Sequence, residues 1–139
     1  MTNRGRMLAV DYGEKNVGLA CSDELGLTVS PLPSLPNRGK HDFLRRIAAA
    51  VSELGAREVV LGMPLRMDGS SGDAVDRMDG ILRSLRRAVP IPVSGVDERL
   101  STVEALEIWR AMTPRQQKRY RTVDSLAAAL ILERHLEGS

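Results

Sequence analysis

The chain has 139 residues and a mass of 15.2 kDa, with 42% hydrophobic and 27% charged residues and a net charge of +2 at pH 7. This length suits one domain with a substantial core, here taken as residues 1–139, and the composition excludes a disordered or fibrous chain. No apolar run approaches the roughly 18 residues of a membrane span, there is no signal-peptide pattern, and the single Cys21 fits a reducing compartment, so we expect a cytoplasmic protein without membrane contact.

The first third of the sequence has the pattern of three consecutive strands. Residues 6–12 form a continuous apolar run, and two further segments, 16–22 and about 26–35, follow after short turns that are typical of antiparallel hairpins. Three prolines in the third segment remove backbone donors, which predicts that this strand lies at an edge of the sheet.

The rest of the sequence alternates between helical and strand patterns. Helices are expected at about 41–54, 72–88, 101–111 and 123–136, and strands at 59–61 and 91–96. The order β-β-β-α-β-α-β-α-α predicts an α/β fold with a mixed five-stranded sheet and helices on both faces. In this topology the first, fourth and fifth strands run parallel. The basic stretch 115–121 is expected to be a loop.

Carboxylates stand where several of these elements end or begin. Asp11 closes the first strand, Asp97 and Glu98 follow the fifth, and Asp124 opens the last helix. Ligands of such sheets bind outside the carboxyl ends of the parallel strands, so we expect the first three acids at one edge. If the fourth strand lies between the first and the fifth, Asp11 and Glu98 start about two spacings of about 4.8 Å apart, and Gly62 would leave room between them.

Each carboxylate also has a purely structural interpretation. Asp11 precedes a glycine turn and could be a turn former. Asp97 and Glu98 could belong to a solvated loop. Asp124 follows Thr122, a plausible N-cap, so it could serve only as a first-turn acid that the helix dipole favours. The set of three is more persuasive than its members.

Converging carboxylates are what a two-metal phosphodiesterase requires. Such enzymes hold two ions about 3.5–4 Å apart, and Mg²⁺ and Mn²⁺ prefer carboxylate and water oxygens. The basic stretch surrounds one aromatic residue, Tyr120, and has the composition of a nucleic-acid contact, although a solvated loop would look the same. Its four cations are Arg115, Lys118, Arg119 and Arg121.

Four blocks of the sequence together resemble the YqgF/RuvX family. They occur in the family's order, cover nearly the whole chain, and comprise residues 10–23, 62–70, 97–102 and 123–128. The resemblance implies an RNase H-like fold and a metal-dependent nuclease, described both as a Holliday junction resolvase and as a nuclease that matures the 5′ end of 16S ribosomal RNA.

The resemblance also implies roles for individual residues. Asp11, Glu98 and Asp124 are similar to the family's metal-binding catalytic acids. Better-known resolvases of this fold carry an acid where this chain has Gly62, which leaves open whether Asp97 or Glu98 completes the site. The implied phosphate contacts beside these acids are Lys15, Arg66 and Arg99.

Three functional hypotheses follow. The first is a Mg²⁺- or Mn²⁺-dependent endonuclease acting on structured RNA or DNA, and resolution of a DNA junction would further require a homodimer, because it needs two active sites. The second is a phosphotransferase of the sugar kinase–actin type, which needs two such domains and is disfavoured by the length of 139 residues. The third is a non-catalytic nucleic-acid-binding module, in which unneutralised carboxylates would repel the phosphate backbone.

Overall fold

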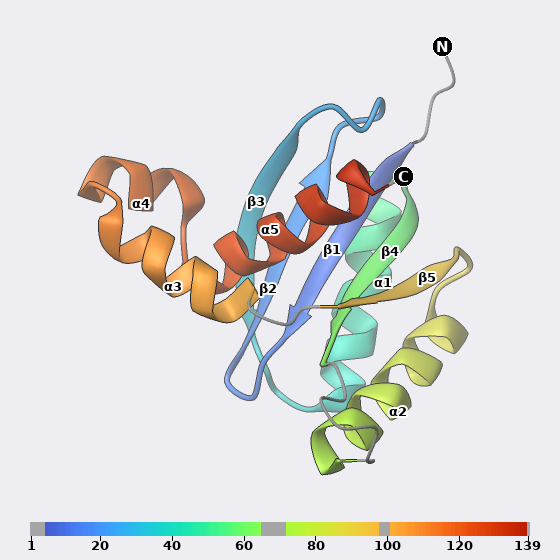
Figure 1. Ribbon diagram of the computed structural model, residues 1–139. Coiled ribbons are helices and arrows are strands. Elements are labelled where there is room, and N and C mark those ends of the chain that lie inside the picture. Colours follow the sequence, from blue (N-terminus) through green and yellow to red (C-terminus); the bar gives the residue numbers. More distant parts are fainter. Residues whose placement is uncertain (1–4, 65–71, 98–100, 139) are drawn as a thin grey trace.

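A computed structural model describes residues 5–64, 72–97 and 101–138, except for the side chains of residues 101 and 102. Within these residues one five-stranded sheet has the order β3-β2-β1-β4-β5 (Figure 1). Strands β1, β2 and β3 are antiparallel neighbours, and β1, β4 and β5 are parallel. The predicted topology is confirmed, including the edge position of the proline-containing strand. The strands are β1 (Arg6–Tyr12), β2 (Asn16–Ser22), β3 (Val29–Pro36), β4 (Ala56–Met63) and β5 (Val93–Asp97).

Helices cover both faces of the sheet. Helices α1 and α2 pack on one face, and α5 crosses the other, while α3 and α4 extend past the β3 side of the sheet (Figure 1). The helices are α1 (Lys40–Leu54), α2 (Asp73–Ala88), α3 (Ser101–Ala111), α4 (Pro114–Tyr120) and α5 (Val123–Glu137).

The side chains of β1 alternate between two hydrophobic layers. Leu8 and Val10 lie in the core beneath α1 and α2, whereas Met7 and Ala9 lie in the core beneath α5. Successive side chains of a strand point to opposite faces. The next position on the α5 face is therefore Asp11, so this carboxylate shares its face with α5.

The α5 face of the sheet is lined by small residues. Ala9 and Ala20 of the sheet meet Ala128 and Ala129 of the helix, and all four are buried. Small side chains on both sides allow the helix backbone to approach the sheet closely. Because Leu126 and Ala127 also pack against Ala105 of α3, the helix is covered on two sides, which explains its nearly all-apolar sequence.

The basic stretch at 115–121 is helical, so the expectation of a loop was wrong. Helix α4 begins with a capping box in which Thr113 accepts from the Gln116 amide and the Gln116 side chain accepts from the Thr113 amide, with Pro114 in the first turn. This pattern is a helix start signal that outweighs the polarity of the segment. The helix ends at Tyr120, and its C-cap residue Arg121 adopts a φ of 71°.

Candidate active site

Asp11 lies at the carboxyl end of β1 and is partly exposed. Its antiparallel partner on β2 is Gly18, and the pair lies one step before the last pair of the hairpin, Tyr12 with Val17. The hairpin register is fixed because Val10 and Leu19 are also paired and buried on the α1 side. Directly opposed residues of a strand pair share a face, so the Asp11 side chain faces α5, and a side chain at position 18 would face it too.

Asp124 lies in the first turn of α5. Thr122 caps this helix by accepting a hydrogen bond from the Ser125 amide at 3.0 Å, as the sequence predicted. The Ser125 hydroxyl is fully buried and donates to the Leu32 carbonyl of β3 at 2.5 Å. The cap and this bond together fix where the first turn of α5, and with it Asp124, meets the sheet.

Gly18 is where the two aspartates come together. A β-carbon at Gly18 would lie 2.0 Å from the backbone oxygen of Asp124 and 3.1 Å from its β-carbon. Cβ positions of directly opposed strand residues are about 4.5–5.5 Å apart, so the β-carbons of Asp11 and Asp124 are separated by at most about 9 Å. The sheet and the first turn of α5 thus bring both carboxylates to the same corner of the sheet.

Partial burial raises the pKa of the Asp124 carboxyl above its ordinary value. Removal from water disfavours the charged form of an acid. The charged form is stabilised when a cation lies close to it. A cation bound beside Asp124 would offset this cost of burial.

Of the two acids that the sequence left open at the end of β5, the structure describes Asp97. Strand β4 lies between β1 and β5, as the predicted geometry required. Val93 packs in the α1–α2 core and Val96 against the α5 core, so alternation along β5 puts Asp97 on the face opposite to Asp11. Met63 is the β4 partner of Asp97. The buried Gly62 precedes Met63, and it lies on β4 between the carboxyl ends of β1 and β5.

Three predicted site residues lie outside the residues that the structure describes. They are Arg66, Glu98 and Arg99. Lys15 is described and is exposed in the turn that follows Asp11. The structure therefore brings together Asp11 and Asp124, and it places Lys15 at the same edge of the sheet.

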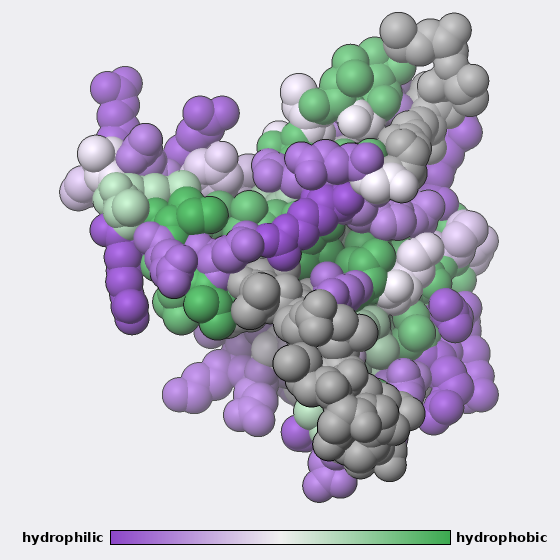
Figure 2. Space-filling model, viewed as in Figure 1, coloured by the Kyte–Doolittle hydropathy of each residue, from purple (hydrophilic) through white to green (hydrophobic). Residues whose placement is uncertain are grey.

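The cations of α4 point to solvent. Arg115, Lys118 and Arg119 are exposed, and Figure 2 shows hydrophilic side chains projecting on the side where α4 lies. Arg121 is also exposed and lies three residues before Asp124 in the chain. Tyr120 instead packs with the buried cluster of Ala105, Leu126 and Ala127, together with Trp109 and Met112. Its ring therefore serves packing, whereas the cations remain available to a ligand.

Two residues that position the site were not singled out by the sequence. Gly18 lies in the interior of a strand, where glycine often marks the close approach of another backbone, so this signal was present. Ser125 gave no comparable signal, because its partner Leu32 is 93 residues away.

The donor atoms of this corner fit a hard divalent cation. Among the described residues no group of three or more histidines, cysteines, aspartates and glutamates lies close enough to hold a metal ion. The described donors are the two aspartates, and carboxylate oxygens suit Mg²⁺ or Mn²⁺ rather than a zinc site. Asp11 and Asp124 could therefore supply part of a metal-binding set.

No helix in the described part of the chain is both long and apolar enough to cross a bilayer.

Comparison with known proteins confirms the fold. A Thermus thermophilus RuvC in complex with a Holliday junction substrate superposes with a TM-score of 0.57 at 13% identity, covering 96% of this chain and 97% of that one. The Fowlpox virus Holliday junction resolvase gives a TM-score of 0.56 at 13% identity, over 96% and 99% of the two chains. At this identity the likeness shows the shared RuvC-like, RNase H-like fold alone.

Sequence relatives are closer. A protein of Syntrophus aciditrophicus named "Putative pre-16S rRNA nuclease" is 39% identical over 133 residues, which cover 96% of this chain and 89% of the relative. A protein of Clavibacter michiganensis with the same name is 41% identical over 135 residues, covering 96% and 83%. The family described as "RuvX: Holliday junction resolvase" matches residues 5–138. Because this match spans nearly the whole chain, the protein belongs to the RuvX family of nucleases, as its four sequence blocks predicted.

Proposed function

We propose that this protein is a metal-dependent endonuclease that hydrolyses phosphodiester bonds of structured RNA, and that its substrate is the 5′ leader of precursor 16S ribosomal RNA. The observation that carries the proposal is the convergence of Asp11 and Asp124 at Gly18. Relatives that are 39% and 41% identical carry the name of a nuclease for this RNA, which supports the choice of substrate.

The proposed ligand set is Asp11, Asp124 and Glu98. Asp97 is the weaker alternative, because it lies on the opposite face of the sheet from Asp11. Ions bound there would activate the attacking water and stabilise the leaving oxygen. The three carboxylates would hold and space these ions, and Lys15 would bind the phosphate beside them. The proposed contribution of Arg66 and Arg99 is additional charge against the phosphate backbone.

In this proposal the catalytic acids and the cations that bind the substrate belong to different elements. Asp11 is fixed by a central strand and Asp124 by a capped helix, so neither carboxylate depends on a long loop for its position. The exposed cations of α4 and Arg121 directly precede α5. They would hold the substrate next to the acids without contacting the reacting phosphate.

A second candidate activity is resolution of a four-way DNA junction. It is favoured by the fold that this chain shares with the two resolvases. Symmetric resolution requires two active sites, so this activity predicts a homodimer. A non-catalytic module is the third candidate, and it predicts binding without cleavage.

One experiment separates these functions. The purified protein is incubated with a precursor 16S 5′ leader, a four-way junction and single-stranded DNA, each with Mg²⁺, Mn²⁺ or EDTA. We expect metal-dependent cleavage of the leader that the Asp11→Asn variant lacks. Asp23→Asn is a matched control, because Asp23 lies in the β2–β3 turn at the opposite end of β2. Cleavage that persists in EDTA or in Asp11→Asn would contradict the metal mechanism, and preferential cleavage of the junction by a dimer would favour the resolvase.

A further inference from the structure

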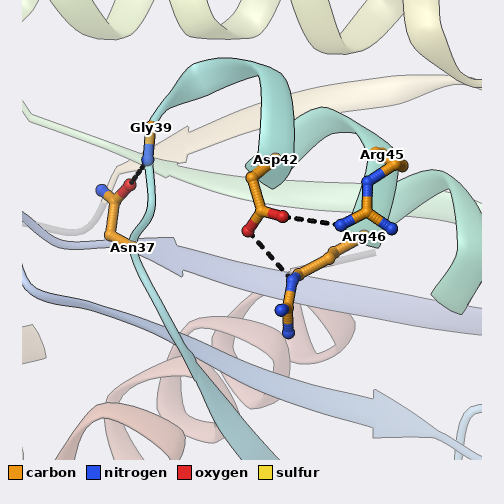
Figure 3. Close-up of polar contacts among 5 residues, drawn as sticks. All are labelled: Asn37, Gly39, Asp42, Arg45 and Arg46. Atoms are coloured by element: carbon orange, nitrogen blue, oxygen red, sulfur yellow. Dashed lines mark hydrogen bonds and ion pairs between the residues drawn. The ribbon is translucent and has the colours of Figure 1, made fainter.

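Asn37 ties the turn after Asp11 to the start of α1. Its backbone amide donates to the Lys15 carbonyl at 2.8 Å, and its side-chain amide donates to the Gly13 carbonyl at 2.7 Å. Its side-chain oxygen accepts from the Gly39 amide at 3.0 Å (Figure 3). Asn37 thus makes two bonds to the β1–β2 turn and one to the residue that precedes α1. The backbone positions of these two segments are fixed relative to each other.

This arrangement places three exposed cations on two neighbouring backbone segments. Lys15 lies on the turn, and Arg38 and Lys40 flank Gly39 on the other segment. Glu14 is the exposed acid beside Lys15 in the turn. Asp76 and Arg77 of α2 line the same hollow as Glu14 and Lys40, so four positive charges stand beside two negative charges around these residues. We call the three cations of the two segments the Lys15–Arg38–Lys40 surface.

The nearest acid of α1 is already engaged elsewhere. Asp42 binds Arg45 at 2.7 Å and Arg46 at 2.9 Å (Figure 3). Partial burial alone would raise the pKa of the Asp42 carboxyl, but the hydrogen bonds and charges of the two arginines outweigh burial and lower its pKa. Asp42 is therefore committed to cations one turn further along the helix and leaves Arg38 and Lys40 for another partner.

The surface lies close to the candidate active site. Lys15 is three residue steps beyond the Asp11–Gly18 pair along the hairpin, or about 10 Å at about 3.4 Å per step. Asn37 and Lys40 also line a hollow of about 630 Å³ between the turn and α2, so the space beside them is open. Because α1 packs on the face of the sheet opposite to Asp11, a strand bound at Asp11 would reach Lys40 by bending around this end of the sheet.

We propose that Lys15, Arg38 and Lys40 bind the sugar–phosphate backbone of the substrate next to the cleaved bond, on a surface that Asn37 holds together. The proposal rests on the proposed nuclease function and extends it by naming the path of the substrate strand. Arg38 and Lys40 bind phosphate, and Asn37 is a positioning residue that fixes their distance from Asp11.

Salt dependence of binding tests the two new cations. Affinity for a fluorescein-labelled single-stranded RNA of the 5′ leader is measured in EDTA between about 50 and 200 mM salt, with Asp11→Asn present in every protein so that nothing is cleaved. Each lost phosphate contact lowers the slope of log affinity against log salt by about 0.7. The Arg38→Ala/Lys40→Ala variant should therefore lose about 1.4 of slope and bind at least about tenfold more weakly at the lowest salt.

The matched control removes the same charge from another surface. Arg83 and Arg87 are exposed in the second half of α2. The Arg83→Ala/Arg87→Ala variant should keep the parental slope. If the Arg38→Ala/Lys40→Ala variant also keeps it, or if both variants change the slope equally, the proposal is wrong.

A second variant tests the role of Asn37. Asn37→Asp keeps the acceptor for the Gly39 amide but loses the donor to Gly13. In an otherwise active protein, we expect KM to rise more than kcat falls, with a small fall in melting temperature from the lost bond to Gly13. A large fall in melting temperature, with kcat lowered in proportion to the unfolded fraction and KM unchanged, would show that Asn37 has a structural role only. If RNA binds with the expected slopes but the protein with Asp11 intact cleaves no RNA, the nuclease function is contradicted. The phosphate-binding role of the Lys15–Arg38–Lys40 surface would still be supported.

Discussion

The backbone oxygen of Asp124 occupies the space that a side chain at position 18 would need, because a β-carbon on Gly18 would lie 2.0 Å from it. Gly18 is also the cross-strand partner of Asp11. The same missing side chain therefore allows α5 to approach β2 and brings its first-turn carboxylate to the one that closes β1. The geometry of the candidate metal site depends on this contact between a strand and a helix end.

A methyl group at Gly18 should move α5 away from the sheet. The clash is with backbone, which cannot rotate aside, so Gly18→Ala should lower the free energy of unfolding by about 1–3 kcal/mol and strongly reduce cleavage. Urea denaturation and the cleavage assay measure the two effects.

Gly80 provides the control for this substitution. It lies within α2, and a β-carbon there would meet nothing within 4 Å. Gly80→Ala should raise the free energy of unfolding by about 0.5–1 kcal/mol, because alanine is the better helix former, and leave cleavage unchanged. Equal effects of the two substitutions would show that Gly18 has no special contact.

Metal binding should stabilise the protein through the two converged aspartates. A ligand that binds only the folded state raises stability by mass action. The melting temperature of the unaltered protein should therefore rise with Mg²⁺ or Mn²⁺, and Asp11→Asn and Asp124→Asn should lose most of this rise. Cleavage should fall by about 10³-fold in each, because a bound ion contributes several kcal/mol to the transition state. An undiminished metal-induced rise in Asp11→Asn would exclude Asp11 as a ligand, and Asp23→Asn should keep the full rise.

The two adjacent acids after β5 should differ in importance. Asp97 lies on the face opposite to Asp11, so Asp97→Asn should retain cleavage within a few-fold. Glu98→Gln should abolish cleavage, as expected of the third ligand. Both variants remove one negative charge at adjacent positions, so a comparison of their kcat values shows whether Asp97 or Glu98 is the third ligand. The reverse order of activities would assign the site to Asp97.

The buried hydroxyl of Ser125 should contribute to stability and to the placement of α5. It donates to the Leu32 carbonyl across a large sequence separation. Ser125→Ala would remove this partly buried hydrogen bond and should cost about 1–2 kcal/mol of unfolding free energy. The exposed Ser52 of α1 is the control, and Ser52→Ala should change stability by less than about 0.5 kcal/mol.

The β2–β3 turn should make stability depend on pH in the acid range. The Asp23 carboxylate accepts from the Thr28 and Leu27 amides, and these bonds lower the pKa of Asp23 despite some desolvation. An acid whose pKa is lowered on folding stabilises the fold above its unfolded pKa of about 3.9, and this stability is lost as the pH falls through the folded pKa. Asp23→Asn should therefore be less stable than the parent at pH 7, and the difference should shrink below about pH 4.

Denaturation at several pH values measures this difference. Glu24→Gln removes a neighbouring charge while keeping the acceptor at position 23, so it should not reproduce the effect. A constant difference between Asp23→Asn and the parent from neutral to acid pH would show that ionisation of Asp23 is not responsible.

Much of the fold was determined by local patterns in the sequence. The apolar run of β1, the two short turns and the prolines of β3 sufficed for the antiparallel half of the sheet. The helical patterns of α1 and α2 predicted the crossovers to β4 and β5, and the nearly all-apolar pattern of α5 predicted that this helix is buried. The loop predicted at 115–121 is mostly helix α4, because the capping box of Thr113 and Gln116 starts a helix despite the polarity of the segment.

Within the candidate site, the sequence by itself determined that Asp11 ends a buried strand and that Asp124 begins a capped helix, because strand periodicity and N-cap chemistry are local. Only the tertiary structure decided that these carboxylates meet and that Asp97 faces away from Asp11. Such relationships depend on strand register and on backbone contacts between Gly18 and Asp124, which are 106 positions apart in the chain (124 minus 18). A glycine inside a strand can signal that some backbone approaches closely, but the identity of that backbone is decided only when the sheet and helix α5 are packed together.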